Sequence, residues 1–388
     1  MANNRIYYAI QQIGFKALST DSYNAASGVQ SVGMTTNFNL DQVFELGQLA
    51  IYENIEDIPD VEVTASKVLD GTPLMYHLGT QSSDTTSPSL AGRSTSRTFF
   101  ALSIFPDTSN SAEGTAGSTV ECSGMFVSSV GYNFPLEDNF TEDVTLVGND
   151  KLWKADTRIL NTADLARSNA ISFAGAFVGN EDSPDATSGV NRRQDMLFGT
   201  SASGVDANGQ LADPDITVLP SEVYGLTTSG TNEKTGDNYG AHLASITVSA
   251  DLGRESINEL GRRAPYSRPV TFPLEVSCEI TVTSSSGDMI SATENGILTT
   301  GTGCGDDAGN LSERSIRIAT CEGTRIYLGK KNKLSSVNYG GGDAGGGNVT
   351  VSYTYTTFND FTVMSSIDPH ASGTAWWADR STYLVNLT

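Results

Sequence analysis

Two stretches of this chain carry the same series of strand patterns in the same order. Each series alternates apolar and polar residues, the pattern of half-buried β-strands. The matched segments are 61–66 with 246–251, 78–79 with 260–261, 99–104 with 272–282, 127–132 with 334–339, and 144–147 with 349–355. A unit duplicated within one chain is typical of proteins that build symmetric assemblies.

The predicted fold is mainly β, with two similar antiparallel sandwich or barrel units and a short flanking helix. At 388 residues the chain can bury one large or two ordinary cores. We expect four parts, which are an N-terminal arm at 1–47, a first β unit at 48–155, a loop-rich insertion at 156–240 and a second β unit at 241–388. The insertion is either a set of loops packed against neighbours or a small appended subdomain.

Helical spacing is found at three places. Residues 251–260 put Leu252, Ile257 and Leu260 on one face, which predicts a short helix ended by Gly261. Residues 163–176 also have helical character, and 38–46 have mixed spacing. The small polar segments 82–96 and 340–347 are predicted to be exposed hairpin loops. The second of these lacks the G-K-[ST] ending of a phosphate-binding loop.

The net charge is −22, from 45 acidic and 23 basic residues. A surface that grips a phosphate backbone is usually basic, so tight nucleic-acid binding is not expected. The charge is compatible with a surface that lets nucleic acid pass, and general solubility is the alternative interpretation.

Cysteine and histidine spacing does not indicate a catalytic or metal site. The four cysteines are too far apart for a C-x-x-C motif, although Cys304 and Cys321 could form a disulfide instead of remaining free thiols. The three histidines show no metal-binding spacing, and His77 is expected to be a packed strand residue. We therefore expect no enzymatic activity, no cofactor and no metal. No signal peptide and no membrane-length apolar run is visible, which predicts a soluble protein made in a cytosol.

Two kinds of charged cluster are candidates for function. Guanidinium groups beside turns suit charge-assisted pairing between subunits, or else form an ordinary surface patch; they are Arg192, Arg193, Arg262, Arg263 and Arg268. Dense carboxylates are a solvated face, a weak calcium site, or a repulsive lining against DNA. The candidate lining residues are Glu137, Asp138, Glu142 and Asp143, and a similar cluster lies at 53–60.

Several segments resemble the tail tube proteins of tailed bacteriophages. They are 44–47, 55–63, 67–71, 191–195 and 259–266. The resemblance implies a β-sandwich or barrel whose subunits form stacked rings around a channel for double-stranded DNA. A chain with two such units would form a trimeric ring with pseudo-sixfold symmetry, or a hexameric one. The implied partners are copies of the chain, other tail proteins and DNA in transit, without a membrane.

The resemblance also implies a location in the virion tail after assembly in the host cytoplasm. A second interpretation is a virion decoration protein or a host- or glycan-binding β-sandwich module. Such a module would form small discrete oligomers that bind cells, whereas a tube protein would form rings or tubes. An enzyme with a β-sandwich fold is the third interpretation, which a hydrolase screen would test.

Overall fold

The computed structural model describes most of the chain. The described residues are 6, 8, 11–17, 23–80, 90, 96–105, 118–155, 173–174, 189–197, 217–220, 223, 241–261, 265–284, 313–340 and 348–365. Most of the predicted loop 82–96, the predicted helix 163–176 apart from two residues, Arg262, Arg263, Cys304 and most of 340–347 lie outside them.

The protein is mainly β, as predicted, and its longest strand belongs to two sheets. The N-terminal half of β8 (Ser118–Pro135) pairs with β7 (Thr98–Ile104) and β10 (Leu152–Ala155). Its C-terminal half pairs with β9 (Thr141–Gly148) and β12 (Ala241–Asp251). Between the halves, Gly124 has a φ of 63° at a break in the register with β7. Glycine suits this bend because a side chain disfavours positive φ.

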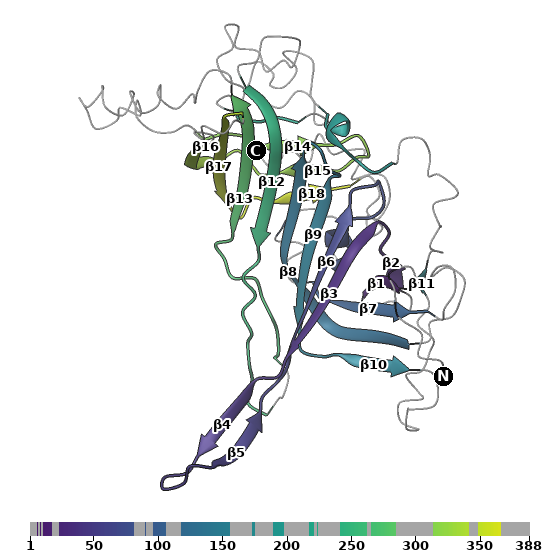
Figure 1. Ribbon diagram of the computed structural model, residues 1–388, viewed down its shortest axis with the longest axis vertical. Helices are drawn as coiled ribbons and strands as arrows, with labels where there is room; N and C mark the ends of the chain where they lie inside the picture. The colour runs from purple at the N-terminus through teal and green to yellow at the C-terminus, as the bar shows by residue number, and fades with distance from the viewer. Residues whose placement is uncertain are drawn as a thin grey trace, which may run out of the picture.

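The smaller of these sheets has the order β11-β2-β1-β7-β8-β10. Its remaining strands are β1 (Gln11–Ala17), β2 (Tyr23–Ala25) and β11 (Phe173–Ala174). The larger sheet has the order β3-β6-β9-β8-β12-β13-β17-β16, and every neighbouring pair is antiparallel. Figure 1 shows these strands side by side, with β16 and β3 at the two edges. Its remaining strands are β3 (Val29–Asn37), β6 (Asp60–Val68), β13 (Glu275–Ser284), β16 (Lys333–Gly340) and β17 (Thr350–Phe358).

The larger sheet consists of two groups of four strands with the same internal order. We call β3, β6, β9 and β8 the first quartet, and β12, β13, β17 and β16 the second quartet. In each quartet the strands stand in the sequence order first, second, fourth, third. The two quartets meet where β8 pairs with β12.

The register within the quartets also corresponds. The first two strands shift register between Val29 and Ser31 in the first quartet, and between Leu243 and Ser245 in the second. The last two strands shift after Val127, before Ser129, and after Leu334, before Ser336. When residues are counted from these shifts, the pair Val61↔Gly148, which joins β6 to β9, corresponds to the pair Val276↔Thr357, which joins β13 to β17. All three ladders of one quartet therefore recur in the other.

Of the five segment matches made from sequence, two agree with this correspondence, two do not, and the match of 78–79 with 260–261 lies outside the quartets. Segments 127–132 and 334–339 lie in the third strands, and 144–147 and 349–355 belong to the fourth strands. Segment 61–66 lies in β6, however, whereas 246–251 lies in β12, the first strand of its quartet. Segments 99–104 and 272–282 are likewise wrongly matched, because β7 lies outside the quartets.

Two long connections leave the same end of the larger sheet. The first carries a hairpin of β4 (Leu40–Phe44) and β5 (Ile51–Glu56), which projects away from the body in Figure 1. The second joins β12 to β13 and descends toward the same side. The helix predicted at 251–260 is wrong. This segment instead forms isolated antiparallel bridges, Arg254↔Val270 and Ile257↔Ser267.

One hydrophobic core underlies both quartets. A short helix, α1 (Met75–Gly79), packs into it together with a small sheet of β14 (Arg317–Ala319), β15 (Arg325–Tyr327) and β18 (Thr362–Met364). A short 3-10 turn, η4 (Arg193–Asp195), lies outside the core. The segment 1–47 was expected to be an arm, but β1 and β3 are sheet strands paired with β7 and β6.

Candidate assembly surfaces

The face of the larger sheet opposite the core is polar and acidic. Strand register places Thr64, Thr145 and Ser129 in one row across this face, and Thr247, Glu279 and Thr354 in another. The carboxylates on it are Asp60, Glu62, Asp143, Asp251, Glu275 and Glu279. Lys333, at the β16 edge, is the one Lys or Arg that the register of the eight described strands puts there. We call this surface the open face.

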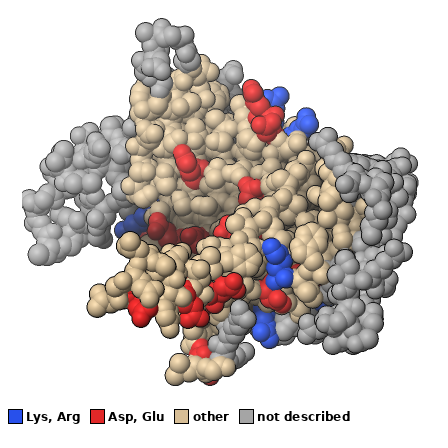
Figure 2. All heavy atoms as spheres, turned by 60° about the horizontal axis from the view of Figure 1, so that its bottom comes forward, with Lys and Arg blue, Asp and Glu red and all other residues tan. Residues whose placement is uncertain are grey.

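Charge on the visible surface follows the same trend. Figure 2 brings the lower end of the molecule forward, and acidic side chains lie in and around a hollow there. Basic side chains are also visible in this view, some of them beside acidic ones.

The four acidic residues selected from sequence have different environments. Glu137 and Asp138 are exposed beyond the end of β8, and Asp143 lies half-buried on the open face. Glu142 is fully buried, so its assignment to a channel lining is wrong. It has the same strand parity as the core residues Val144 and Leu146, which is why it points inward.

Glu142 holds α1 against the first quartet. Its carboxylate accepts hydrogen bonds from the backbone N–H groups of Met75 (2.7 Å) and Tyr76 (3.0 Å) and from the hydroxyl of Tyr132 (3.0 Å). Burial raises the pKa of Glu142, and these donors and the charge of Lys67 partly oppose that rise. Lys67 is also buried, and its Nζ contacts Asp70 at 2.9 Å. This network therefore has a structural role in the core.

Arg192 and Arg193 lie beside one of the predicted acids. Together with Leu136, Glu137 and Gln194 they line a pocket of about 360 Å³. Nε of Arg192 donates to Oδ1 of Asn139 (2.9 Å), which ties η4 to the turn between β8 and β9. The two arginines are exposed, so they remain candidates for a subunit contact.

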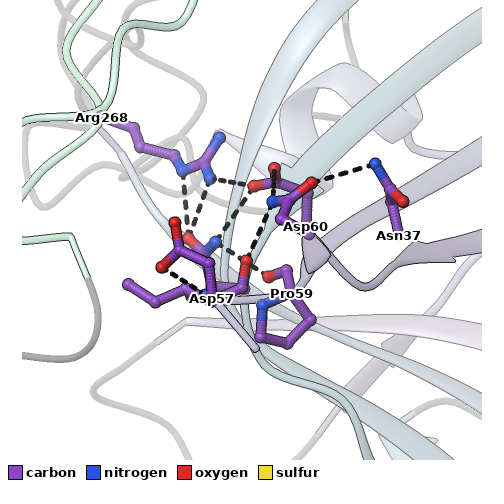
Figure 3. A network of polar contacts seen from close by, with 8 residues as sticks. Asn37, Asp57, Pro59, Asp60 and Arg268 are labelled. Atoms are coloured by element: carbon purple, nitrogen blue, oxygen red, sulfur yellow. Dashed lines mark hydrogen bonds and ion pairs between the residues drawn. The ribbon is translucent and has the colours of Figure 1, made fainter. Parts of the chain in front are cut away.

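Arg268 fastens the β12–β13 connection to the first quartet. Its Nη2 lies 2.9 Å from Oδ1 of Asp60 and also donates to Oδ1 of Asn149 (2.9 Å), as Figure 3 shows. Burial of Asp60 disfavours its charge, but hydrogen bonds from Asn39, Arg268 and Asn149 outweigh this effect and lower its pKa. The Arg268 side chain is only 11 % exposed, so this predicted interface arginine is occupied within its own chain.

Arg254 makes a second clamp that the sequence analysis did not select. Its Nε donates to the carbonyl of Val127 (2.7 Å), and its guanidinium lies 5.2 Å from the ring centre of Phe126. Burial lowers its pKa to about 10. Arg254 and Arg268 therefore hold a connection from the second quartet on strands of the first.

The outer edges of the larger sheet have incompletely buried core residues. Val32 and Met34 on β3, and Leu334 and Val337 on β16, are half-buried and pack against the core. At the β8–β12 junction, the corresponding residues are at most 2 % exposed; they are Ile246, Val248, Val127 and Val130. Each edge therefore resembles one side of that junction without its partner.

The β4–β5 hairpin exposes an apolar surface. Leu46 and Leu49 at its tip are fully exposed. Other large apolar residues of the hairpin region are also exposed, and they are Phe38, Leu40, Val43, Phe44, Ile51, Tyr52 and Ile55. Large apolar residues exposed together on one element often mark a site of protein association.

Neither a metal-binding cluster nor a membrane-length apolar helix is present in the part of the chain that the structure describes. There, no cluster of three or more His, Cys, Asp and Glu residues is placed to hold a metal. His77 lies in α1 and not in a strand, and its Nε2 contacts the carbonyl oxygen of Val363 at 3.1 Å. Cys321 is a free, exposed thiol. Within the same residues, no helix is long and apolar enough to span a bilayer.

Comparison with known proteins gives partial similarities to tube components of injection systems. No protein-family model and no curated protein matches the chain. The sheath–tube complex of an extracellular contractile injection system (PVC) contains a chain that is 12 % identical, with a TM-score of 0.29. The match covers 40 % of this chain and 95 % of that one.

Two further matches have similar values. The sheath/tube terminator of the same system is 13 % identical with a TM-score of 0.30, and the match covers 40 % of this chain and 100 % of the other. The tube-terminating cap of the anti-feeding prophage is 12 % identical with a TM-score of 0.30, covering 40 % and 95 %.

Proposed function

We propose that this chain is a structural protein of a bacteriophage tail that assembles into stacked rings, forming a tube through which double-stranded DNA passes. The observation that carries the proposal is the larger sheet itself. Its two quartets share strand order and register, and they join edge to edge at β8–β12. Repetition of that junction between chains would continue the sheet until it closes.

The two quartets are proposed to be copies of one ancestral unit. Three copies of the chain would then supply six quartets, giving a trimeric ring with pseudo-sixfold symmetry. The four-part division of the chain is retained in this proposal, except that β1 and β3 belong to the sheets of the first unit.

The open face is proposed to line the channel. It offers hydroxyl groups and carboxylates, and DNA would stall against a wall that captured its phosphates with Lys and Arg. Repulsion acts within a Debye length of roughly 8 Å at physiological salt, which keeps the duplex mobile inside the tube. Glu62 and Glu279 are the exposed acids best placed in the middle of the sheet for this role.

The β4–β5 hairpin is proposed to provide the contact between stacked rings. It projects beyond the end of the sheet and exposes apolar side chains that a neighbouring ring would cover. Burial of such side chains contributes about 1.5–3 kcal/mol for each large residue.

Sedimentation velocity of the purified full chain, with and without double-stranded DNA, tests this function. We expect large assemblies whose formation depends on concentration and which do not retain DNA at physiological salt. Small discrete oligomers that bind cells or glycans would instead support the decoration or receptor-binding interpretation. A chain that stays monomeric at high concentration would refute the tube.

A further inference from the structure

We propose that β16 of one chain pairs antiparallel with β3 of the next in the register of the internal β8–β12 junction, so that Asn338 faces Thr35 and Ser336 faces Asn37. This inference rests on the proposed function, because it specifies how neighbouring copies in a ring join. The structure supplies the template within one chain, and the quartet correspondence transfers it to the outer edges.

The register of the internal junction can be transferred to the outer edges because the register breaks lie at matching positions in the two quartets. At the internal junction, Gly131 pairs with Ser249 and Ser129 pairs with Asp251. Ser129 and Ser336 each directly follow the break between the last two strands of their quartets. Counting two residues onward makes Gly131 correspond to Asn338.

Residues of β3 are matched with those of β12 in the same way. Ser245 and Ser31 each directly follow the break between the first two strands. Counting four residues onward makes Ser249 correspond to Thr35, and counting six makes Asp251 correspond to Asn37. The pairs Asn338–Thr35 and Ser336–Asn37 are the result.

Burial supports this pairing independently of the counting. Tyr132 and Val248 face each other at the internal junction and are both fully buried. Their counterparts are Tyr339, which is 57 % exposed, and Met34, which is half-buried. The proposed register brings Tyr339 opposite Met34, so each would cover the other as their counterparts do.

The remaining side chains at this contact are also compatible with it. On the open face, the four residues Thr35, Asn37, Ser336 and Asn338 are polar, uncharged and exposed. Directly opposed like charges would destabilise a strand pair, and none occurs among these residues. An unpaired strand edge is a ready template for another chain, so both edges are competent to pair.

Disulfide trapping tests the register with two positions on each edge. The background is the full chain with Cys304→Ser and Cys321→Ser. Cys122 and Cys278 are kept because they are buried. The in-register variants are Thr35→Cys with Asn338→Cys, and Asn37→Cys with Ser336→Cys. The matched off-register variants exchange partners, giving Thr35→Cys with Ser336→Cys, and Asn37→Cys with Asn338→Cys.

Oxidation with copper phenanthroline should link the in-register variants into covalent multimers on non-reducing gels. Directly opposed residues have Cβ atoms about 4.5–5.5 Å apart, whereas diagonal ones are about 7–8 Å apart, too far for a disulfide. Linking of the off-register variants instead, or of none in particles that microscopy shows to be rings, would overturn the register and leave the ring intact. Failure of the wild-type chain to form rings would overturn the proposed function as well.

Discussion

Replacement of Val337 by lysine should prevent assembly without unfolding the chain. Val337 is half-buried at the β16 edge of the free chain, so a lysine there can extend its ammonium into water. In the ring, Val337 would take the environment of Val130, which is 2 % exposed. An inward-pointing charge on a sheet edge is a known obstacle to strand pairing.

The magnitude follows from the two environments. An unpaired charge in a buried site costs several kcal/mol, about 3–5 for a broken buried pair. Since about 1.4 kcal/mol corresponds to a tenfold change, the dissociation constant of each junction should rise roughly a hundredfold to a few thousandfold. Sedimentation velocity over a concentration series would measure this rise, and circular dichroism would report whether the β fold is kept.

Two matched variants make the test specific. Glu279→Lys places a lysine on the open face away from both sheet edges, and it should leave assembly almost unchanged. Val130→Lys places it at the corresponding internal junction, and it should unfold the chain. Assembly of Val337→Lys at the wild-type concentration would refute the claim that this edge is buried between copies.

Four further predictions concern other parts of the molecule. Glu142→Ala should lower the free energy of unfolding by about 3–5 kcal/mol, measured by urea denaturation, because three buried donors lose their acceptor; an unchanged urea midpoint would contradict this. Arg268→Ala should lower it by only about 1 kcal/mol or less, since its partner Asp60 is 54 % exposed. The pKa of Asp60 is lowered in the folded chain, so its charged form stabilises the fold relative to Asp60→Asn. This stabilisation is present above the ordinary pKa of 3.8 and is lost as pH falls through the folded-state pKa. The reverse trend in urea midpoints would refute it. Glu279→Lys should leave ring formation intact and increase DNA retention in a filter-binding assay, and weaker retention would count against a channel-lining role.

The strands of the second quartet were largely predictable from sequence. Clear alternation at 272–282 and 349–355 lies in or around strands that the structure confirms, β13 and β17. Alternation in β9 also predicts that Glu142 points into the core, because its strand parity matches that of Val144 and Leu146. Charge alone indicates a solvated face for the whole acidic cluster, and only strand parity shows that one of its members points inward.

Other features depend on contacts that no local pattern encodes. Segment 251–260 has helical spacing, but Arg254 bonds to the carbonyl of Val127 and Leu252 N to that of Ser128, which favours an irregular connection. Short alternating strands also resemble one another, so β6 was matched with β12, and only the ladder registers identify β3 as the counterpart of β12. The open face could be assigned only after strand order was known.

Electron microscopy of the assembled wild-type chain tests the central claim most directly. Averages viewed down the particle axis should show a closed ring of three chains with six similar sheet segments around an open channel. Side views should show such rings stacked through the β4–β5 hairpins. Particles without a channel, or rings in which the larger sheets of neighbouring chains do not meet at β3 and β16, would contradict the account.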